Sequence, residues 1–287
     1  MTVDRQTARL LVTCPDHEGL IARVAGFIAE HGGNILEADQ HTDPDHGEFF
    51  MRVEIELGQF RLDRSSFESA WRDTASECGL RWHMYWGNEV KRMAILASRE
   101  AHCLSDLLWR WHAGEFHVEV PFVAGNHEEM ATWCEPYRVP FHHMPVTPET
   151  KPQQEDALRK LIDEHQIDFL VLARYMQILS PAFVEDYKER IINIHHSFLP
   201  AFAGPRPYHH AYERGVKLIG ATSHYVTSDL DQGPIIAQST MEVGHRDTVA
   251  DMVRKGRDLE RVVLARAVRL HIEDKILVSR NRTVVFD

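Results

Sequence analysis

The stretch Arg190-Ile-Ile-Asn-Ile-His-His-Ser-Phe-Leu-Pro200 decides the fold of this chain. Its isoleucines are typical of a buried strand, and Pro200 marks the loop that follows. Because alternate side chains of a strand share a face, Asn193 and His195 should point together. A polar pair at the carboxyl end of a buried strand is where open α/β sheets place their chemistry.

Outward from this strand, the chain after Lys91 alternates short apolar runs with helical patterns. Strands are predicted at residues 93–97, 117–125 and 168–173, and helices near residues 105–112, 153–164 and 248–271. This alternation predicts a Rossmann-like, doubly wound α/β domain. No G-x-G-x-x-G or P-loop follows the strand at 93–97, so dinucleotide chemistry is not expected.

A different pattern precedes Lys91. Strands are predicted at residues 8–14, 34–40, 48–57 and 81–86, with helices at 20–31 and about 64–78, in the order βαββαβ. The first helix has an apolar stripe at helical spacing, and Gly32-Gly33 is typical of a left-handed stop. The sequence therefore predicts two domains, at residues 6–89 and 90–287.

Several ordered motifs point to one family. Asn193-Ile-His-His-Ser-Phe-Leu-Pro-Ala-Phe202 is followed by Pro207-Tyr208, Ile219-Gly-Ala-Thr-Ser-His-Tyr-Val226 and Asp231-x-Gly-Pro-Ile-Ile236. Over almost the entire chain the sequence resembles the folate-dependent formyltransferase family, most closely its formyltetrahydrofolate deformylase branch. That family's catalytic residues fall on Asn193, His195 and Asp231.

The resemblance implies a hydrolase that converts 10-formyltetrahydrofolate to formate and tetrahydrofolate. Such an enzyme balances one-carbon folate pools and supplies formate for purine synthesis. Asn193 and His195 would donate hydrogen bonds to the oxygen of the tetrahedral intermediate. Asp231 would act as general base for water and then return a proton to N10, a double role that a pKa raised by partial burial would support. Folate is then the small-molecule substrate, and no cofactor is expected.

The segment after the strand at 168–173 carries the expected folate contacts. In the family the equivalent loop lines the pterin cleft, which assigns substrate binding to Tyr175, Met176, Gln177, Ile178 and Leu179. Gln177 stands where many relatives carry arginine, and without the resemblance this pattern is more often plain core. Thr222 and His224 are expected to orient Asp231 and ordered water.

The N-terminal pattern is similar to that of ACT domains, through Asp16-x-x-Gly-Leu-Ile-Ala22 and Gly33-x-Ile35. These ferredoxin-like domains commonly bind small amino acids between paired copies. The resemblance implies an effector at Asp16, Gly19 and Leu20, with methionine and glycine as the expected effectors, and a homo-oligomer formed through ACT pairing. The simpler interpretation is that Gly19 only shapes a turn and that the domain only dimerises.

The loop after the strand at 93–97 bears on the formyl acceptor. Related enzymes that formylate a phosphorylated glycinamide have a glycine-rich loop there, which holds the phosphate with backbone N–H groups. This chain has Ser98-Arg-Glu-Ala-His-Cys103 instead, and Glu100 would repel a phosphate. Water is therefore the expected acceptor.

Composition narrows the class of protein. The chain has 287 residues, 26% of them charged and 44% hydrophobic, as is ordinary for globular proteins. A net charge of -11 argues against a nucleic-acid surface, and no apolar run is long enough to span a bilayer. Four widely spaced cysteines predict free thiols in a reducing, cytoplasmic setting. The 19 histidines include no H-E-x-x-H motif, so no metal is expected.

Three other hypotheses remain open. One is a true formyltransferase with an unrecognised amine acceptor. Another is a non-catalytic amino-acid sensor that keeps the second domain only to bind folate, although such a binder needs no complete set of Asn193, His195 and Asp231. The last is a metal-dependent hydrolase.

Overall fold

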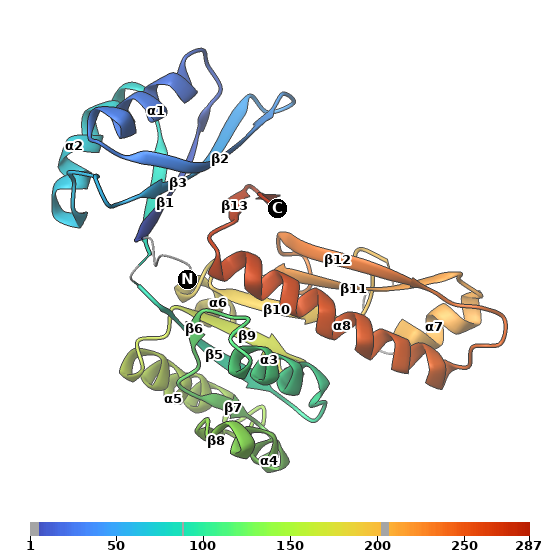
Figure 1. Ribbon diagram of the computed structural model, residues 1–287. Helices are drawn as coiled ribbons and strands as arrows, with labels where there is room; N and C mark the ends of the chain where they lie inside the picture. The colour runs from blue at the N-terminus through green and yellow to red at the C-terminus, as the bar shows by residue number, and fades with distance from the viewer. Residues whose placement is uncertain (1–5, 88, 202–206) are drawn as a thin grey trace. The chain divides into compact units, whose positions relative to one another are not determined.

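The computed structural model describes residues 6–87, 89–201 and 207–287, which form two compact units (Figure 1). Unit 1 extends to Val90 and also contains Glu273–Ser279 and Val284–Asp287, while unit 2 contains Lys91–Ile272 and Arg280–Thr283. The two domains predicted at 6–89 and 90–287 differ from this division at the C-terminal end. They also include residue 88 and residues 202–206, which lie outside the described residues.

Unit 1 has the predicted βαββαβ order. Its elements are β1 (Thr7–Pro15), α1 (Leu20–Glu30), β2 (Asn34–Asp43), β3 (Glu48–Glu56), α2 (Arg64–Glu77) and β4 (Arg81–Trp86). The strands form an antiparallel sheet in the order β2-β3-β1-β4. Both helices pack into one apolar core with the sheet, in which Trp71 of α2 is fully buried and Phe27 of α1 stacks edge-on against it. This is the ferredoxin-like arrangement expected for an ACT domain.

Local signals explain where these helices begin and end. α2 begins after Asp63, whose carboxylate accepts from the backbone N–H of Ser66 while the Ser66 hydroxyl accepts in return from the N–H of Asp63, a capping box. α1 ends at Glu30, and Gly32, directly after the C-cap His31, has a φ of 78°, in the left-handed region predicted for this stop.

The C-terminal segment of unit 1 is held by two arginines of the sheet. Arg52 is 2% exposed, and it donates to the backbone carbonyls of Glu273 and Asp274. Arg9 forms an ion pair with the Asp274 carboxylate at 2.9 Å. These contacts explain why residues 273–279 belong to unit 1, although they directly follow a helix of unit 2.

Unit 2 is built on an eight-stranded sheet of β5 (Lys91–Ala97), β6 (Val118–Glu119), β7 (Val123–Gly125), β8 (Phe141–His143), β9 (Phe169–Ala173), β10 (Ile191–His195), β11 (Leu218–Tyr225) and β12 (Ile235–Glu242). Seven strands run in the order β12-β11-β10-β9-β5-β7-β8, with β6 beside β5. The neighbouring strands β10, β9, β5, β7 and β8 are parallel to one another. Strands β11 and β12 pair antiparallel at the other edge of the sheet. The prediction of a Rossmann-like domain is therefore confirmed for the parallel part of the sheet. Because β11 and β12 are antiparallel to their neighbours, the whole sheet is a mixed one.

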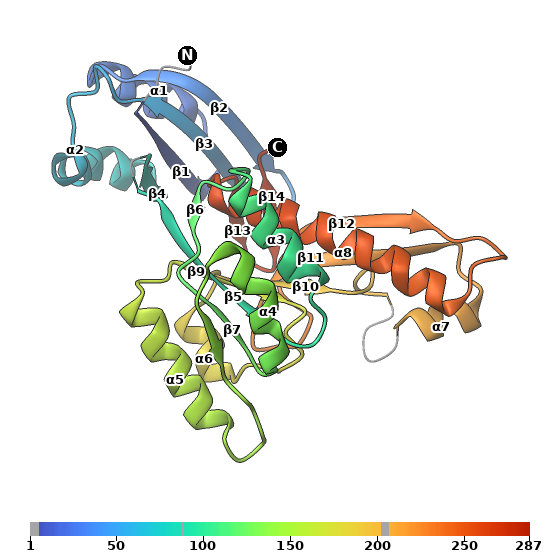
Figure 2. The same cartoon turned by 60° about the horizontal axis from the view of Figure 1, so that its bottom comes forward.

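Helices cover both faces of this sheet (Figures 1 and 2). They are α3 (His102–His112), α4 (Ala131–Cys134), α5 (Lys151–Glu164), α6 (Pro181–Asp186), α7 (Pro207–Arg214) and α8 (Val249–Ile272), with 3-10 turns at Glu128–Met130 and Glu135–Tyr137. α5 and α6 share a core with the sheet face that carries Ala94 and Leu170. α8 contacts β10, β11, β12 and α3, and its His271 packs against Phe169 on the other face.

Two short strands, β13 (Ile276–Ser279) and β14 (Arg282–Val285), pair with each other near the C-terminus. The four cysteines are buried and free. Within the described ranges, no helix combines the length and the apolar character needed to cross a membrane.

Candidate active site

The end of β10 brings the predicted polar pair into position. Asn193 and His195 lie two residues apart on this strand, so they share a face, and they pair in register with His224 and Thr222 of β11. His195 is buried and Asn193 is half-buried. The last residue of the motif quoted above, Phe202, lies outside the described residues.

The loop between β11 and β12 carries Asp231 to the same place. Asp231 adopts a left-handed φ of 57°, an uncommon conformation that shapes this tight loop. Gly233 is needed because a Cβ there would lie 1.7 Å from the carbonyl oxygen of Tyr225. The loop therefore closes tightly against the end of β11, where the N–H of Tyr225 donates to Pro234.

His195 and Asp231 meet directly. Nδ1 of His195 lies 3.3 Å from Oδ2 of Asp231, which places the Nδ1 proton toward the carboxylate. Nε2 of His195 is buried, and within the described part of the chain it has no hydrogen-bond partner. Because a buried polar atom without a partner is costly, this nitrogen is the group of the site that most needs a ligand.

His224 fixes the orientation of Asn193. Nδ1 of His224 donates to the carbonyl of Tyr225 at 2.8 Å, so its Nε2 is free to accept from Nδ2 of Asn193 at 3.2 Å. Burial lowers the pKa of His224, which keeps this ring neutral. Nε2 also lies 3.8 Å from Oδ1 of Asp231, too far for a hydrogen bond. The second Nδ2 proton of Asn193 remains available to a ligand.

The charge state of Asp231 differs from the expectation. Partial burial was expected to raise its pKa, but the hydrogen bond from His195 outweighs burial, and the pKa of Asp231 is lowered from 3.8. The carboxylate is therefore ionised at neutral pH. Its lowered pKa makes it a weaker base toward water than a carboxylate with a raised pKa would be.

Thr222 supports the loop after β10. Its hydroxyl donates to the Ser197 carbonyl at 2.8 Å and accepts from the Leu199 N–H at 3.0 Å and from Gln238 at 2.9 Å. These bonds hold the segment that leaves β10. The geometry thus places Thr222 beneath the loop rather than against Asp231.

The predicted folate loop divides into two kinds of residue. Tyr175 and Leu179 belong to the apolar core, and burial raises the pKa of Tyr175 to about 12. Met176 and Ile178 are 59% and 63% exposed, which is high for large apolar side chains. Gln177 between them is half-buried. The exposed pair is the part of this loop that can contact a ligand.

The sequence alone did not identify Ser98 as part of this site. Its hydroxyl accepts from the backbone N–H of Met176 at 3.0 Å and donates to Asn126 at 2.7 Å. Ser98 is buried at the carboxyl end of β5, beside the end of β9. Its position directly after a predicted parallel strand was the signal that could have found it.

The expected effector residues lie at the turn from β1 to α1. Asp16 and Gly19 are exposed, whereas Leu20 is 3% exposed and packs in the core of unit 1. Gly19 has a φ of 86° and open space around its Cβ direction. A turn-shaping role thus accounts for Gly19 by itself, and Asp16 remains free to meet a ligand or a second copy.

Glu100, in the loop after β5, is already paired. Its Oε2 lies 2.6 Å from Nη2 of Arg257 on α8. The ion pair partly neutralises the negative charge that was expected to repel a phosphate. The charge of Glu100 is therefore a weaker argument for water as the formyl acceptor.

Among the described residues, one group has metal-ligand spacing, namely His102, Cys103 and Glu260.

Comparison with known proteins assigns each of the two units to a protein family. Residues 91–268 match the formyl transferase family and residues 8–59 match the ACT domain family. A formyltetrahydrofolate deformylase of Synechocystis sp. is 52% identical over 98% of this chain and 98% of its own, and one of Bacillus subtilis is 48% identical over 97% and 93%. The crystal structure of a formyltetrahydrofolate deformylase from Pseudomonas syringae superposes with a TM-score of 0.97 at 47% identity, covering 100% of this chain and 96% of that one.

Identity at this level over nearly the full length, with both domains in the same order, exceeds what a shared fold alone explains. The chain belongs to the formyltetrahydrofolate deformylase family of hydrolases and joins an ACT domain to a formyltransferase domain.

Proposed function

We propose that this chain hydrolyses the N10-formyl group of 10-formyltetrahydrofolate, giving formate and tetrahydrofolate, with Asn193, His195 and Asp231 as its catalytic residues. The observation that carries the proposal is that Nε2 of His195 is buried and, among the described residues, has no partner, while Asn193 lies on the same face of β10. Both groups are held by fixed partners, so they need no rearrangement when charge develops on an oxygen between them.

The chemistry follows from these groups. Water attacks the formyl carbon, and the carbonyl oxygen takes up the negative charge. Asn193 donates to that oxygen through its free Nδ2 proton, and His195 donates through Nε2 when its ring carries both protons. Asp231 accepts the hydrogen bond from Nδ1 of His195 and keeps the ring in place. Its carboxylate takes one proton from the attacking water and passes that proton to N10 as the C–N bond breaks, which leaves formate and tetrahydrofolate.

Met176 and Ile178 supply an apolar surface for the folate rings. Two large apolar side chains exposed on one loop favour a flat, partly apolar ligand. Ser98 fixes the loop by accepting from the backbone of Met176. Folate is the substrate in this proposal, and no further cofactor takes part in the reaction.

The ACT domain is proposed to make the activity responsive to amino acids. Methionine and glycine are the proposed effectors, bound near Asp16 and Gly19 where two copies pair as a homo-oligomer. Such control would adjust the balance between formyl-folate and free tetrahydrofolate, with the formate available for purine synthesis.

The test is formate release from 10-formyltetrahydrofolate by the full chain without any amine, repeated with methionine and with glycine. Formate formed in buffer alone supports hydrolysis, and a change with either amino acid supports the regulatory proposal. Loss of the formyl donor only when an amine is added would instead favour a formyltransferase.

A further inference from the structure

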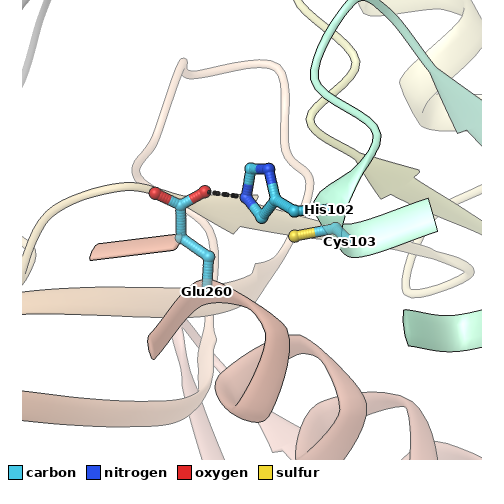
Figure 3. A group of neighbouring side chains, drawn as sticks. All are labelled: His102, Cys103 and Glu260. Atoms are coloured by element: carbon cyan, nitrogen blue, oxygen red, sulfur yellow. Dashed lines mark hydrogen bonds and ion pairs between the residues drawn. The ribbon is translucent and has the colours of Figure 1, made fainter. Parts of the chain in front are cut away.

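A buried carboxylate on α8 joins three separate segments of unit 2. Glu260 is 1% exposed, and its Oε1 accepts from the Tyr208 hydroxyl at 2.9 Å. Its Oε2 lies 2.7 Å from Nε2 of His102 (Figure 3) and 3.3 Å from Nε of Arg174. The partners come from α7, from the start of α3 and from the loop that follows β9.

The carboxylate is charged. Burial by itself would raise the pKa of Glu260, but the His102 hydrogen bond, the Arg174 charge and the Tyr208 hydrogen bond together lower it. A buried charge of this kind is tolerated only when its partners stay in place. Glu260 therefore constrains the positions of all three.

A metal is the first alternative for this cluster. The ligand atoms of His102, Cys103 and Glu260 lie within 4.8 Å of one another, and Figure 3 shows the side chains turned toward one another. However, the Arg174 guanidinium lies against the same carboxylate oxygen that would bind a cation. Burial also raises the pKa of Cys103, which opposes the thiolate that a metal requires. The cluster is therefore complete as an ion-pair network.

Arg174 links this network to the folate loop. It is the first residue after β9 and has a left-handed φ of 60°, a conformation that is uncommon for a residue with a side chain and costs free energy. Its side chain is 14% exposed, and within the described ranges its Nε has no hydrogen-bond partner. The charge of Glu260 is thus what holds this side chain inward.

We propose that Glu260 is a positioning residue that sets the shape of the folate-binding loop through Arg174. By holding Arg174 inward it stabilises the left-handed backbone there. The backbone in turn decides where Met176 and Ile178 present their apolar side chains. The inference rests on the folate site proposed above, and Glu260 acts at a distance from the substrate.

Glu260→Gln tests this inference because it keeps the size of the side chain and removes its charge. We expect the KM for 10-formyltetrahydrofolate to rise by roughly tenfold or more while kcat changes much less, since a displaced loop weakens binding. A merely structural defect would instead reduce the fraction of active enzyme, which lowers kcat and leaves KM unchanged.

Arg174→Gln and the double variant provide the coupling test. If Glu260 acts through Arg174, each single variant raises KM and the double variant is no worse than the more affected single one. Arg254→Gln is the matched control, because Arg254 lies earlier on α8 and its ion pair with Asp251 is exposed and outside the Glu260 cluster. We expect KM in that control to equal the wild-type value.

Three results would overturn the inference: an unchanged KM in folded Glu260→Gln, fully additive effects in the double variant, or an equal KM increase in the control. If Glu260→Gln does not fold, Arg174→Gln alone decides, and an unchanged KM contradicts the inference. Wild-type protein assayed in parallel separates the two proposals. Active wild type with unaffected variants rejects only the role of Glu260, whereas wild type that releases no formate rejects the proposed function and this inference with it.

Discussion

At the scale of single residues, the site depends on the two ring nitrogens of His195. One faces the Asp231 carboxylate, and the other is buried without a partner among the described residues. The carboxylate selects the orientation of the ring, so the second nitrogen is directed to a ligand before the ligand arrives. Such preorganisation is the usual source of transition-state stabilisation in acyl-transfer sites.

Replacing either donor by alanine should slow turnover strongly. We expect His195→Ala and Asn193→Ala each to lower kcat by about 100- to 1000-fold, because each removes one preorganised donor from the developing oxyanion. The double variant should lose less than the product of the two, since the donors act on one oxygen. Steady-state formate release measures all three. A loss below tenfold in both single variants would contradict these roles.

Sequence reasoning predicted part of this site for a clear reason. The alternation of a strand places Asn193 and His195 on one face, and this needs no tertiary information. The bond between Asn193 and His224 depends on the register of β10 and β11, which segments remote in sequence determine. The pKa of Asp231 likewise depends on a contact with His195, so composition and local pattern could not give its direction.

At the scale of elements, helix α1 shows how one glycine ends a helix. Gly32 has a φ of 78°, and a Cβ there would lie 2.6 Å from the backbone oxygen of Gln59. Gly26, in the middle of the same helix, has no atom within 4 Å of the corresponding position. The two glycines therefore form a matched pair for a stability experiment.

Gly32→Ala should lower the free energy of unfolding of unit 1 by about 1–3 kcal/mol, because alanine is strained at this φ and meets a backbone oxygen. Gly26→Ala should raise it by about 0.5–1 kcal/mol, as alanine favours the helix. Urea unfolding followed by circular dichroism checks both. Equal effects of the two substitutions would show that the left-handed stop carries no special constraint.

His271, near the end of α8, makes unit 2 sensitive to acid. Burial lowers the pKa of His271 from 6.5 to about 3, so the unfolded chain binds a proton that the folded chain rejects between these values. The free energy of unfolding should therefore fall as the pH drops below 6.5, by up to about 1.4 kcal/mol per pH unit from this group. His271→Gln does not titrate and can still accept from the Tyr225 hydroxyl. A pH series of unfolding curves should show a smaller loss in that variant, and parallel losses would contradict this account.

Long, periodic elements were predictable, and short ones were not. The strand at 81–86 and the helix at 20–31 agree with the structure to within a residue. The predicted strand at 117–125 is instead two short strands, β6 and β7. The short helices α4 and α6 and the pair β13–β14 have too few residues for a period to emerge.

At the scale of the whole molecule, unit 1 combines segments from the N-terminal and the C-terminal parts of the chain. The sequence pattern changes near Lys91, so that boundary could be anticipated. The return of residues 273–279 to unit 1 could not, because it depends on Arg52 and Arg9 contacting groups more than 200 residues away. No local pattern encodes such a contact.

Arg52→Met should release this C-terminal segment. Removing the buried guanidinium abolishes its hydrogen bonds to the Glu273 and Asp274 carbonyls, which should cost about 1–3 kcal/mol of unfolding free energy. Arg23→Met is the control, because the ion pair of Arg23 with Glu77 is exposed on both sides and should change stability by less than about 0.5 kcal/mol. Amide hydrogen exchange should accelerate in residues 273–279 of the first variant only. Unchanged exchange there would contradict the role of Arg52.

The measurement that tests the central claim most directly compares Asp231→Asn with wild type for both folate binding and formate release. In the proposed mechanism, the ionised Asp231 carboxylate orients His195 and carries the proton, and it does not hold the folate rings. The account therefore predicts that the variant binds 10-formyltetrahydrofolate nearly as tightly as wild type while kcat for formate release falls by at least about 100-fold. Comparable turnover in the folded variant would contradict the assignment of this site.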